Sequence, residues 1–106
     1  MPTYMFKVNY VGEGVQGLRI EGGMKRREAA EAVIRSLGGR LLSMYYAFGD
    51  ADAYVIAEMP DAASAAALVL TLNASGRVEV TTTVLMTPQE IDEAVAKQAD
   101  YRPPGA

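Results

Sequence analysis

The 106-residue sequence contains no cysteine and no histidine. It therefore cannot form a disulfide, present a thiolate nucleophile, pair an imidazole with a serine or bind a metal ion through histidine. Any reaction would have to rest on Tyr, Asp, Glu, Lys and Arg. We expect neither a cofactor nor a metal ion.

Positive charge is also scarce. Ten Lys and Arg residues stand against 13 Asp and Glu, a net charge of −3. This balance is the opposite of what a nucleic-acid backbone requires, so nucleic acid is not an expected partner. The one basic run, Lys25–Arg27, is followed by Glu28 and Glu31, which indicates a solvated helix end.

Long apolar runs are missing as well. No stretch approaches the ~20 apolar residues of a membrane span, and the first residues lack the pattern of a secretory signal. We therefore expect a cytoplasmic protein that does not contact membranes. The length suits one domain, expected at residues 1–99 with a tail at 100–106.

Alternation and helical spacing divide the chain into elements. Strands are predicted at residues 3–11, 40–48, 53–59 and 77–86, and helices at 24–37, 62–74 and 88–99. Local signals mark several ends: Asp61 is a good N-cap, Thr87 to Glu90 form a capping box, and Gly38 can end the first helix. The segment 12–23, with five glycines, is predicted to be a loop.

The resulting order is β-α-β-β-α-β followed by a C-terminal helix. Because crossover connections are right-handed, this order predicts a four-stranded antiparallel sheet with its helices on one face. The expected fold class is α+β, of the ferredoxin-like kind.

The two faces of the predicted sheet differ in character, because side chains alternate along each strand. The face toward the helices is predicted to carry Tyr4, Phe6, Val8, Leu42, Met44, Tyr46, Phe48, Val55, Ala57, Val78, Val80 and Val84. The other face is predicted to carry Met5, Lys7, Asn9, Leu41, Ser43, Tyr45, Tyr54, Ile56, Glu58, Thr81, Thr83 and Leu85. The second set is too apolar for water and too polar for a dry core, so we predict a two-fold homodimer that buries it.

Several short motifs together resemble a known family. They are Met1-Pro2-Thr3-Tyr4, Asn9-Tyr10, Ala29-Ala30, Leu37-Gly38-Gly39-Arg40-Leu41, Gly49 with Asp52, and Val55-Ile56. In this order they resemble the GYD-domain family of small bacterial and archaeal proteins, over roughly residues 2 to 95. The resemblance implies the fold of the dimeric α+β barrels and homo-oligomerisation, and it implies no activity. The family's Gly-Tyr-Asp triplet is matched at Gly49 and Asp52, with Ala51 where the tyrosine is expected.

Five polar side chains on the predicted interface face are candidates for binding a small molecule: Lys7, Asn9, Tyr45, Tyr54 and Glu58. Burial without a partner would raise the pKa of Glu58 and lower that of Lys7, and either shift could serve proton transfer. The alternative is a structural ion pair between Lys7 and Glu58, across strands or between subunits.

Two further motifs have structural explanations. Asp50 and Asp52 could hold a hard cation or act as an acid and a base, but aspartate is also a common turn former. Gly12, Gly14 and Gly17 have the spacing of a dinucleotide-binding loop. Such a loop must open a helix within a parallel sheet, and neither condition is predicted.

The sequence therefore predicts a small homo-oligomeric α+β module that assembles through its sheet face and binds a small molecule there or only assembles. The alternative is a cofactor-free enzyme of the small-barrel type, resembling a monooxygenase or isomerase, that uses Tyr, Lys and Glu at the same face. A cavity lined by Lys7, Asn9, Tyr54 and Glu58 would favour the enzyme. Mutual pairing and packing of these side chains would favour assembly.

Overall fold

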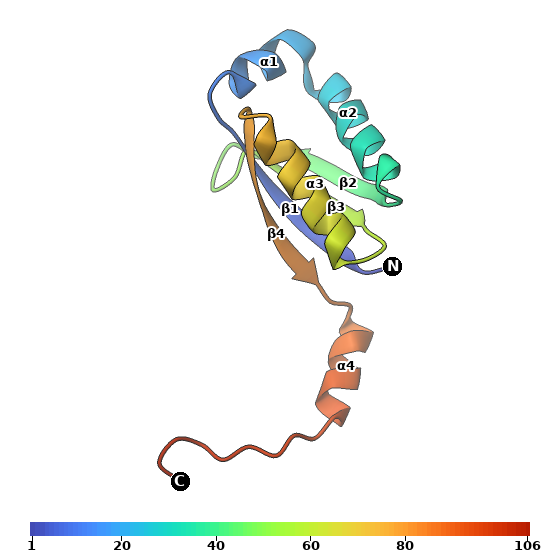
Figure 1. Cartoon of the computed structure of the whole chain (residues 1–106), viewed down its shortest axis with the longest axis vertical. Coiled ribbons are helices and arrows are strands. Elements are labelled where there is room, and N and C mark those ends of the chain that lie inside the picture. Colours follow the sequence, from blue (N-terminus) through green and yellow to red (C-terminus); the bar gives the residue numbers. More distant parts are fainter.

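The computed structural model describes all residues of the chain, 1–106. Its elements are β1 (Thr3–Tyr10), α1 (Gly14–Glu21), α2 (Gly23–Ser36), β2 (Arg40–Tyr46), β3 (Ala53–Glu58), α3 (Ala62–Ala74), β4 (Val78–Leu85) and α4 (Pro88–Ala96). The four strands form one sheet, α2 and α3 lie over one of its faces, and α4 stands apart beyond the end of β4 (Figure 1).

The sheet is antiparallel throughout, with the order β2-β3-β1-β4. The chain passes from β1 through α2 to β2, and β3 lies between these two strands. It passes from β3 through α3 to β4, and β1 lies between those two. Two split βαβ units are thus interleaved. The predicted α+β class and four-stranded antiparallel sheet are confirmed.

The helix ends lie where local signals placed them. The Asp61 carboxylate accepts a hydrogen bond from the Ser64 N–H at 2.8 Å at the start of α3. At the start of α4, Glu90 N–H donates to the Thr87 hydroxyl at 3.1 Å, and Thr87 N–H donates to the Glu90 carboxylate at 3.0 Å. Gly38, with φ of 82°, follows α2. None of the helices has the length and apolar character needed to cross a bilayer.

The predicted loop at 12–23 is wrong, because most of this segment is helical in α1. The glycines of this segment lower its helix propensity, so the sequence pattern did not indicate a helix. Gly14 is required because there is no room for a side chain at this position. A Cβ on Gly14 would lie 1.9 Å from the backbone oxygen of Arg77, just before β4. The glycine motif therefore does open a helix, but in an antiparallel sheet and against a neighbouring backbone, which is not the setting of a dinucleotide site.

One hydrophobic core lies between the sheet and its helices. Phe6, Ile34, Met59 and Leu68 are its largest fully buried side chains, and no polar or charged residue is buried with them. α2 packs mainly on β2, and α3 packs mainly on β4. The two helices therefore cover the two margins of the sheet, and the central strands lie beneath the space between them.

A β-bulge in β2 reverses part of the predicted face assignment. Leu41 lies opposite Ala57 and Ser43 lies opposite Ile56, so Leu42 is an extra residue between them. Leu41 is consequently 8% exposed in the core, and Leu42 is 42% exposed on the other face. The predicted positions of these two leucines are wrong, because an inserted residue shifts the alternation by one. Phe48, predicted to face the helices, lies beyond the end of β2 and is 63% exposed.

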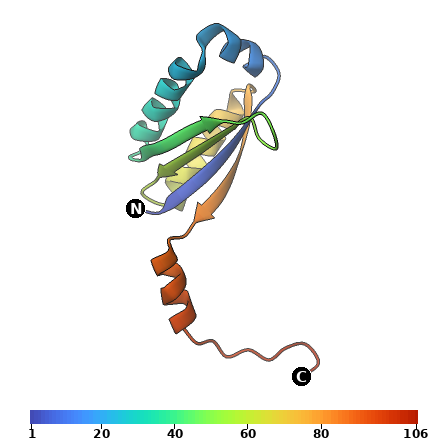
Figure 2. The same cartoon turned by 180° about the vertical axis from the view of Figure 1, so that it is seen from behind.

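The C-terminal helix does not pack on the rest of the chain. α4 has no buried residue and leads into an extended tail that runs away from the sheet (Figure 2). The radius of gyration is accordingly 17.0 Å, against about 13 Å for a compact chain of this length. α4 ends at Ala96, three residues before the predicted end.

The close packing of Gly14 and the open surroundings of Gly17 can be tested by replacing each glycine with alanine. Gly14→Ala is expected to destabilise the protein by about 2 kcal/mol or more, because the new methyl group meets a backbone oxygen that cannot yield. Gly17→Ala, in the same helix with nothing within 4 Å of its Cβ position, is expected to stabilise by about 0.5–1 kcal/mol. Denaturant unfolding followed by circular dichroism measures both. Equal effects of the two substitutions would contradict this account of α1.

Candidate functional site

The sheet surface away from α2 and α3 is the candidate site, and we call it the open face. Its residues follow from strand alternation and register: Met5, Lys7, Asn9, Leu42, Ser43, Tyr45, Tyr54, Ile56, Glu58, Glu79, Thr81, Thr83 and Leu85. Figure 2 shows this surface without a covering helix. All five predicted binding residues lie on it.

The register brings only some of the five predicted residues together. Tyr45 lies opposite Tyr54, and Tyr54 lies opposite Lys7 on the neighbouring strand, which gives one row across the sheet. Asn9 is two residues farther along β1. Glu58 is four residues from Tyr54, or about 13 Å at the usual rise of a strand. The structure therefore places Lys7, Tyr45 and Tyr54 side by side and Glu58 at the other end of the face.

The predicted cross-strand pair between Lys7 and Glu58 is wrong, because each has another partner. Lys7 Nζ lies 2.6 Å from Asp50 Oδ2, in the loop after β2. Glu58 Oε1 accepts hydrogen bonds from Arg40 Nη2 at 2.8 Å and from Arg40 Nε at 3.1 Å. The geometry of the sheet, with Lys7 and Glu58 at opposite ends, prevents their direct contact.

The ion pair with Asp50 fixes the protonation state of Lys7. The hydrogen bond to Asp50 and its negative charge raise the pKa of Lys7, and the same interaction lowers the pKa of Asp50. This is opposite to the lowered pKa that burial alone would give Lys7. At neutral pH, Lys7 is therefore an ammonium group and cannot act as a base.

The loop Gly49–Asp52 is tied to β1 by Asp52, through contacts distant in sequence and not through bonds to the backbone of the turn itself. Asp52 Oδ2 accepts the backbone N–H of Tyr10 at 2.8 Å, and Asp52 N–H donates to the Val8 oxygen at 2.9 Å. Ala51 between the aspartates is fully buried. No group of three or more acidic side chains is placed to hold a metal ion.

The open face is also partly apolar. Leu42 and Tyr45 are 42% and 71% exposed, while Met5, Ile56 and Leu85 are half-buried. Met5 and Ile56 are directly opposed in the register of β1 and β3, so they form an apolar centre. The bulge in β2 adds Leu42 to this surface and removes Leu41 from it.

A second polar group lies on the helix-covered side of the sheet, where no binding site was predicted. Tyr10, at the end of β1, has its pKa raised to about 12 by burial and by Tyr46, with Arg26 acting in the opposite direction. The Tyr46 hydroxyl donates to the Gly23 oxygen at 3.1 Å. Arg26 lies on the same side of α2 as Ala30, Val33 and Ile34. A single charged residue among apolar ones on one side of a helix was the sequence feature that could have indicated this polar group.

These observations define a small α+β domain with one open sheet face. The GYD domain family matches residues 4–95. The chain belongs to this family. No curated protein and no solved structure matches the chain.

Asp52, the aspartate that matches the family's Gly-Tyr-Asp triplet, is predicted to stabilise the fold through its hydrogen bond to Tyr10. Asp52→Ala is expected to destabilise the protein by about 1–3 kcal/mol, because the half-buried N–H of Tyr10 loses its acceptor. Asp50→Ala removes an acidic residue two positions away whose carboxylate is exposed, and it is expected to leave the melting temperature nearly unchanged. Thermal unfolding at one protein concentration measures both. A larger loss for Asp50→Ala would contradict the assignment.

Proposed function

We propose that the protein is a homodimeric module in which two chains pack open face against open face about a two-fold axis. The pair would form a dimeric α+β barrel built from two ferredoxin-like sheets. The observation that supports this most is the apolar centre of the open face, formed by Met5 and Ile56 with Leu42 next to it on β2, with no helix over it.

The accessible surface of the chain is large for its mass. It is 7225 Å², against about 5,700 Å² for a folded monomer of 11.3 kDa. The excess, about 1,500 Å², lies largely in α4 and the tail, where every residue from 86 to 106 is exposed. This surface is available for contact with a partner at α4 and does not measure the interface at the open face.

Two charged residues of the open face, Lys7 and Glu58, are compatible with burial, whereas Glu79 forms no ion pair and would have to stay at the exposed rim of the interface. Lys7 is neutralised by Asp50, and Glu58 by Arg40, within the same chain. Packing a second copy against these pairs would not bury an isolated charge, which would be costly. Together with Asn9, Tyr45 and Tyr54, they would form the polar part of the interface, where a small molecule could be enclosed between the two sheets. The same pairing favours assembly over proton transfer as the role of this face.

The C-terminal helix has a place in this assembly. An isolated helix of nine residues is marginal in water, even with good caps. Ile91 and Val95, four residues apart and therefore on one side of α4, are 45% and 78% exposed. We infer that this apolar side of α4 packs on the partner chain, since the helix finds no support on its own domain.

The interface is tested by a charge placed at its centre. Ile56→Glu is expected to convert a dimer into a monomer at micromolar concentration, because it buries two carboxylates near the two-fold axis. Leu70→Glu is the matched control, since Leu70 is 71% exposed on α3, away from the open face. Sedimentation velocity should give twice 11.3 kDa for the unsubstituted protein and for the control. A monomeric unsubstituted protein, or a dimeric Ile56→Glu variant that is folded by circular dichroism, would overturn the proposal.

The role of α4 is tested separately from that of the sheet. Replacing Ile91 and Val95 together by Ser is expected to weaken dimerisation about tenfold to a hundredfold, because two partly buried apolar side chains are lost. Replacing Gln89 and Glu93 by Ser makes two changes with the same spacing on another side of α4, and should leave the affinity within a few-fold. The dimer dissociation constant, measured by dilution, compares them. Equal affinities for both variants would refute a contact between the apolar side of α4 and the partner.

A further inference from the structure

A cavity lies on the helix-covered side of the sheet, between α2 and α3. Because α2 packs on β2 and α3 on β4, the space above β1 and β3 is left incompletely filled. Ala29 and Ala30 of α2 border this space, and their short side chains do not fill it. The result is a cavity of about 70 Å³ lined by 13 residues, of which all but Arg26 are hydrophobic.

The cavity opens into a wider and more polar cleft of about 370 Å³ toward α1. Four residues border both spaces: Tyr10, Arg26, Leu72 and Val78. The outer cleft adds Glu21, Arg77 and the polar side chains Thr71 and Ser75. The two spaces together have an apolar inner end and a polar entrance, with Arg26 at the boundary.

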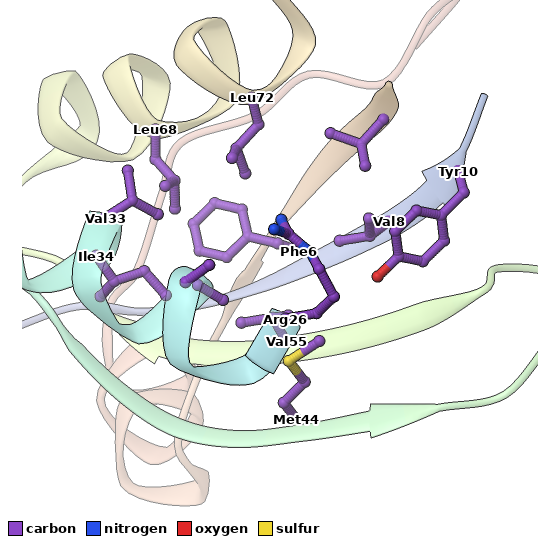
Figure 3. Close-up of a pocket in the computed structure, with 13 residues that line it drawn as sticks. Phe6, Val8, Tyr10, Arg26, Val33, Ile34, Met44, Val55, Leu68 and Leu72 are labelled. Carbon is purple, nitrogen blue, oxygen red and sulfur yellow. The ribbon is translucent and has the colours of Figure 1, made fainter. Parts of the chain in front are cut away.

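Arg26 is placed to receive an anionic group at this boundary. Figure 3 shows its nitrogen atoms directed into the space that Phe6, Val8 and Leu72 surround, with the Tyr10 hydroxyl pointing toward it. Its one ion pair is long, with Nη1 3.4 Å from Glu21 Oε1, and its side chain is 31% exposed. A guanidinium group offers five N–H donors in a planar fork, so capacity for a carboxylate remains.

The Tyr10 hydroxyl adds a second donor. Burial and Tyr46 raise the pKa of Tyr10 to about 12, so the phenol keeps its proton throughout the neutral range. A protonated phenol beside a guanidinium group favours an acceptor with negative charge. Glu21 shows that a carboxylate can approach Arg26 from the cleft side.

We propose that the cavity and its entrance bind a small carboxylic acid, with the apolar body inside and the carboxylate on Arg26 and Tyr10. A volume of about 70 Å³ accommodates roughly five to seven water-sized groups, at about 10–15 Å³ each. The ligand is therefore a short acyl or branched-chain acid or an acid with a single ring, not a long-chain lipid. The site lies within one chain, on the opposite side of the sheet from the open face, so it does not depend on dimerisation.

The test uses three probes with the same six-carbon chain: hexanoate, 1-hexanol and hexylamine. Methyl resonances of Val8, Val33, Leu68 and Leu72, which line the cavity, report on binding by NMR. Hexanoate is expected to shift them with a dissociation constant of about 1 mM or tighter. Hexanol should bind at least about tenfold more weakly, and hexylamine more weakly still, since both lack the charge that Arg26 selects.

Substitutions separate the head group from the cavity. Arg26→Gln should weaken hexanoate binding about tenfold to a hundredfold and leave hexanol unchanged, because a hydrogen bond to a charged group is lost. Arg27→Gln makes the same change at the neighbouring position, which borders neither space, and should have little effect. Glu21→Gln removes the competing carboxylate and should tighten hexanoate binding several-fold.

Three results would overturn the proposal: no methyl shift at saturating hexanoate, equal affinity for hexanoate and hexanol, or shifts confined to methyl groups of the open face such as Ile56. The measurement is repeated on the Ile56→Glu variant. Binding there would support a site within one chain whatever the outcome for the dimer, and loss of binding in a folded monomer would refute it.

Discussion

The burial of one sheet face beneath two helices that pack on opposite margins of the sheet is the constraint on which the rest of the structure depends. The helices cover β2 and β4, while Phe6 of β1 and Val55 of β3 lie under the space between them. The buried face accounts for the core, and the gap between the helices accounts for the cavity. The uncovered face accounts for the apolar surface that includes Ile56. Three features with different chemistry therefore follow from one arrangement of layers.

The polar groups are distributed according to the same division. The core contains no buried polar residue, so the charged side chains lie on the open face, in the loops, on the exposed sides of the helices and at the entrance of the cavity. Asp50 belongs to the loop after β2 and reaches Lys7 on β1. Asp52 of the same loop binds the backbone of β1. This loop therefore organises the end of the open face, and the fully buried Ala51 keeps it close to the sheet.

Features encoded by neighbouring residues could be predicted from the sequence. The alternation of β1, the N-cap at Asp61 and the capping box at Thr87 involve contacts a few residues apart, and all were predicted. Tertiary contacts could not be predicted in this way. Gly14 is placed by a backbone more than 60 residues away, at Arg77. The pairing of Lys7 with Asp50 depends on where a loop folds back. The separation of α4 from the domain follows from packing that a helical pattern does not reveal.

Arg26 could be predicted only in part, because its role depends on both the local sequence pattern and a tertiary contact. Its place on the apolar stripe of α2 is visible in the sequence, but the role of a charged residue there cannot be inferred until the position of α3 is known. The structure shows α3 on the other margin of the sheet and, between the two helices, an apolar space bordered by one cation.

The bulge at Leu42 also bears on solubility. β2 is an edge strand of the sheet, and an exposed edge offers unpaired backbone groups to any other strand, a route to open-ended fibres. A bulge interrupts the regular ladder and increases the local twist, so a foreign strand cannot pair along the whole edge. Contact between faces about a two-fold axis ends with two copies, whereas pairing along edges has no natural limit. The inserted residue Leu42 thus opposes unlimited growth of the sheet at the β2 edge. It also contributes an apolar side chain to the open face, the proposed dimer interface, where association would stop at two copies.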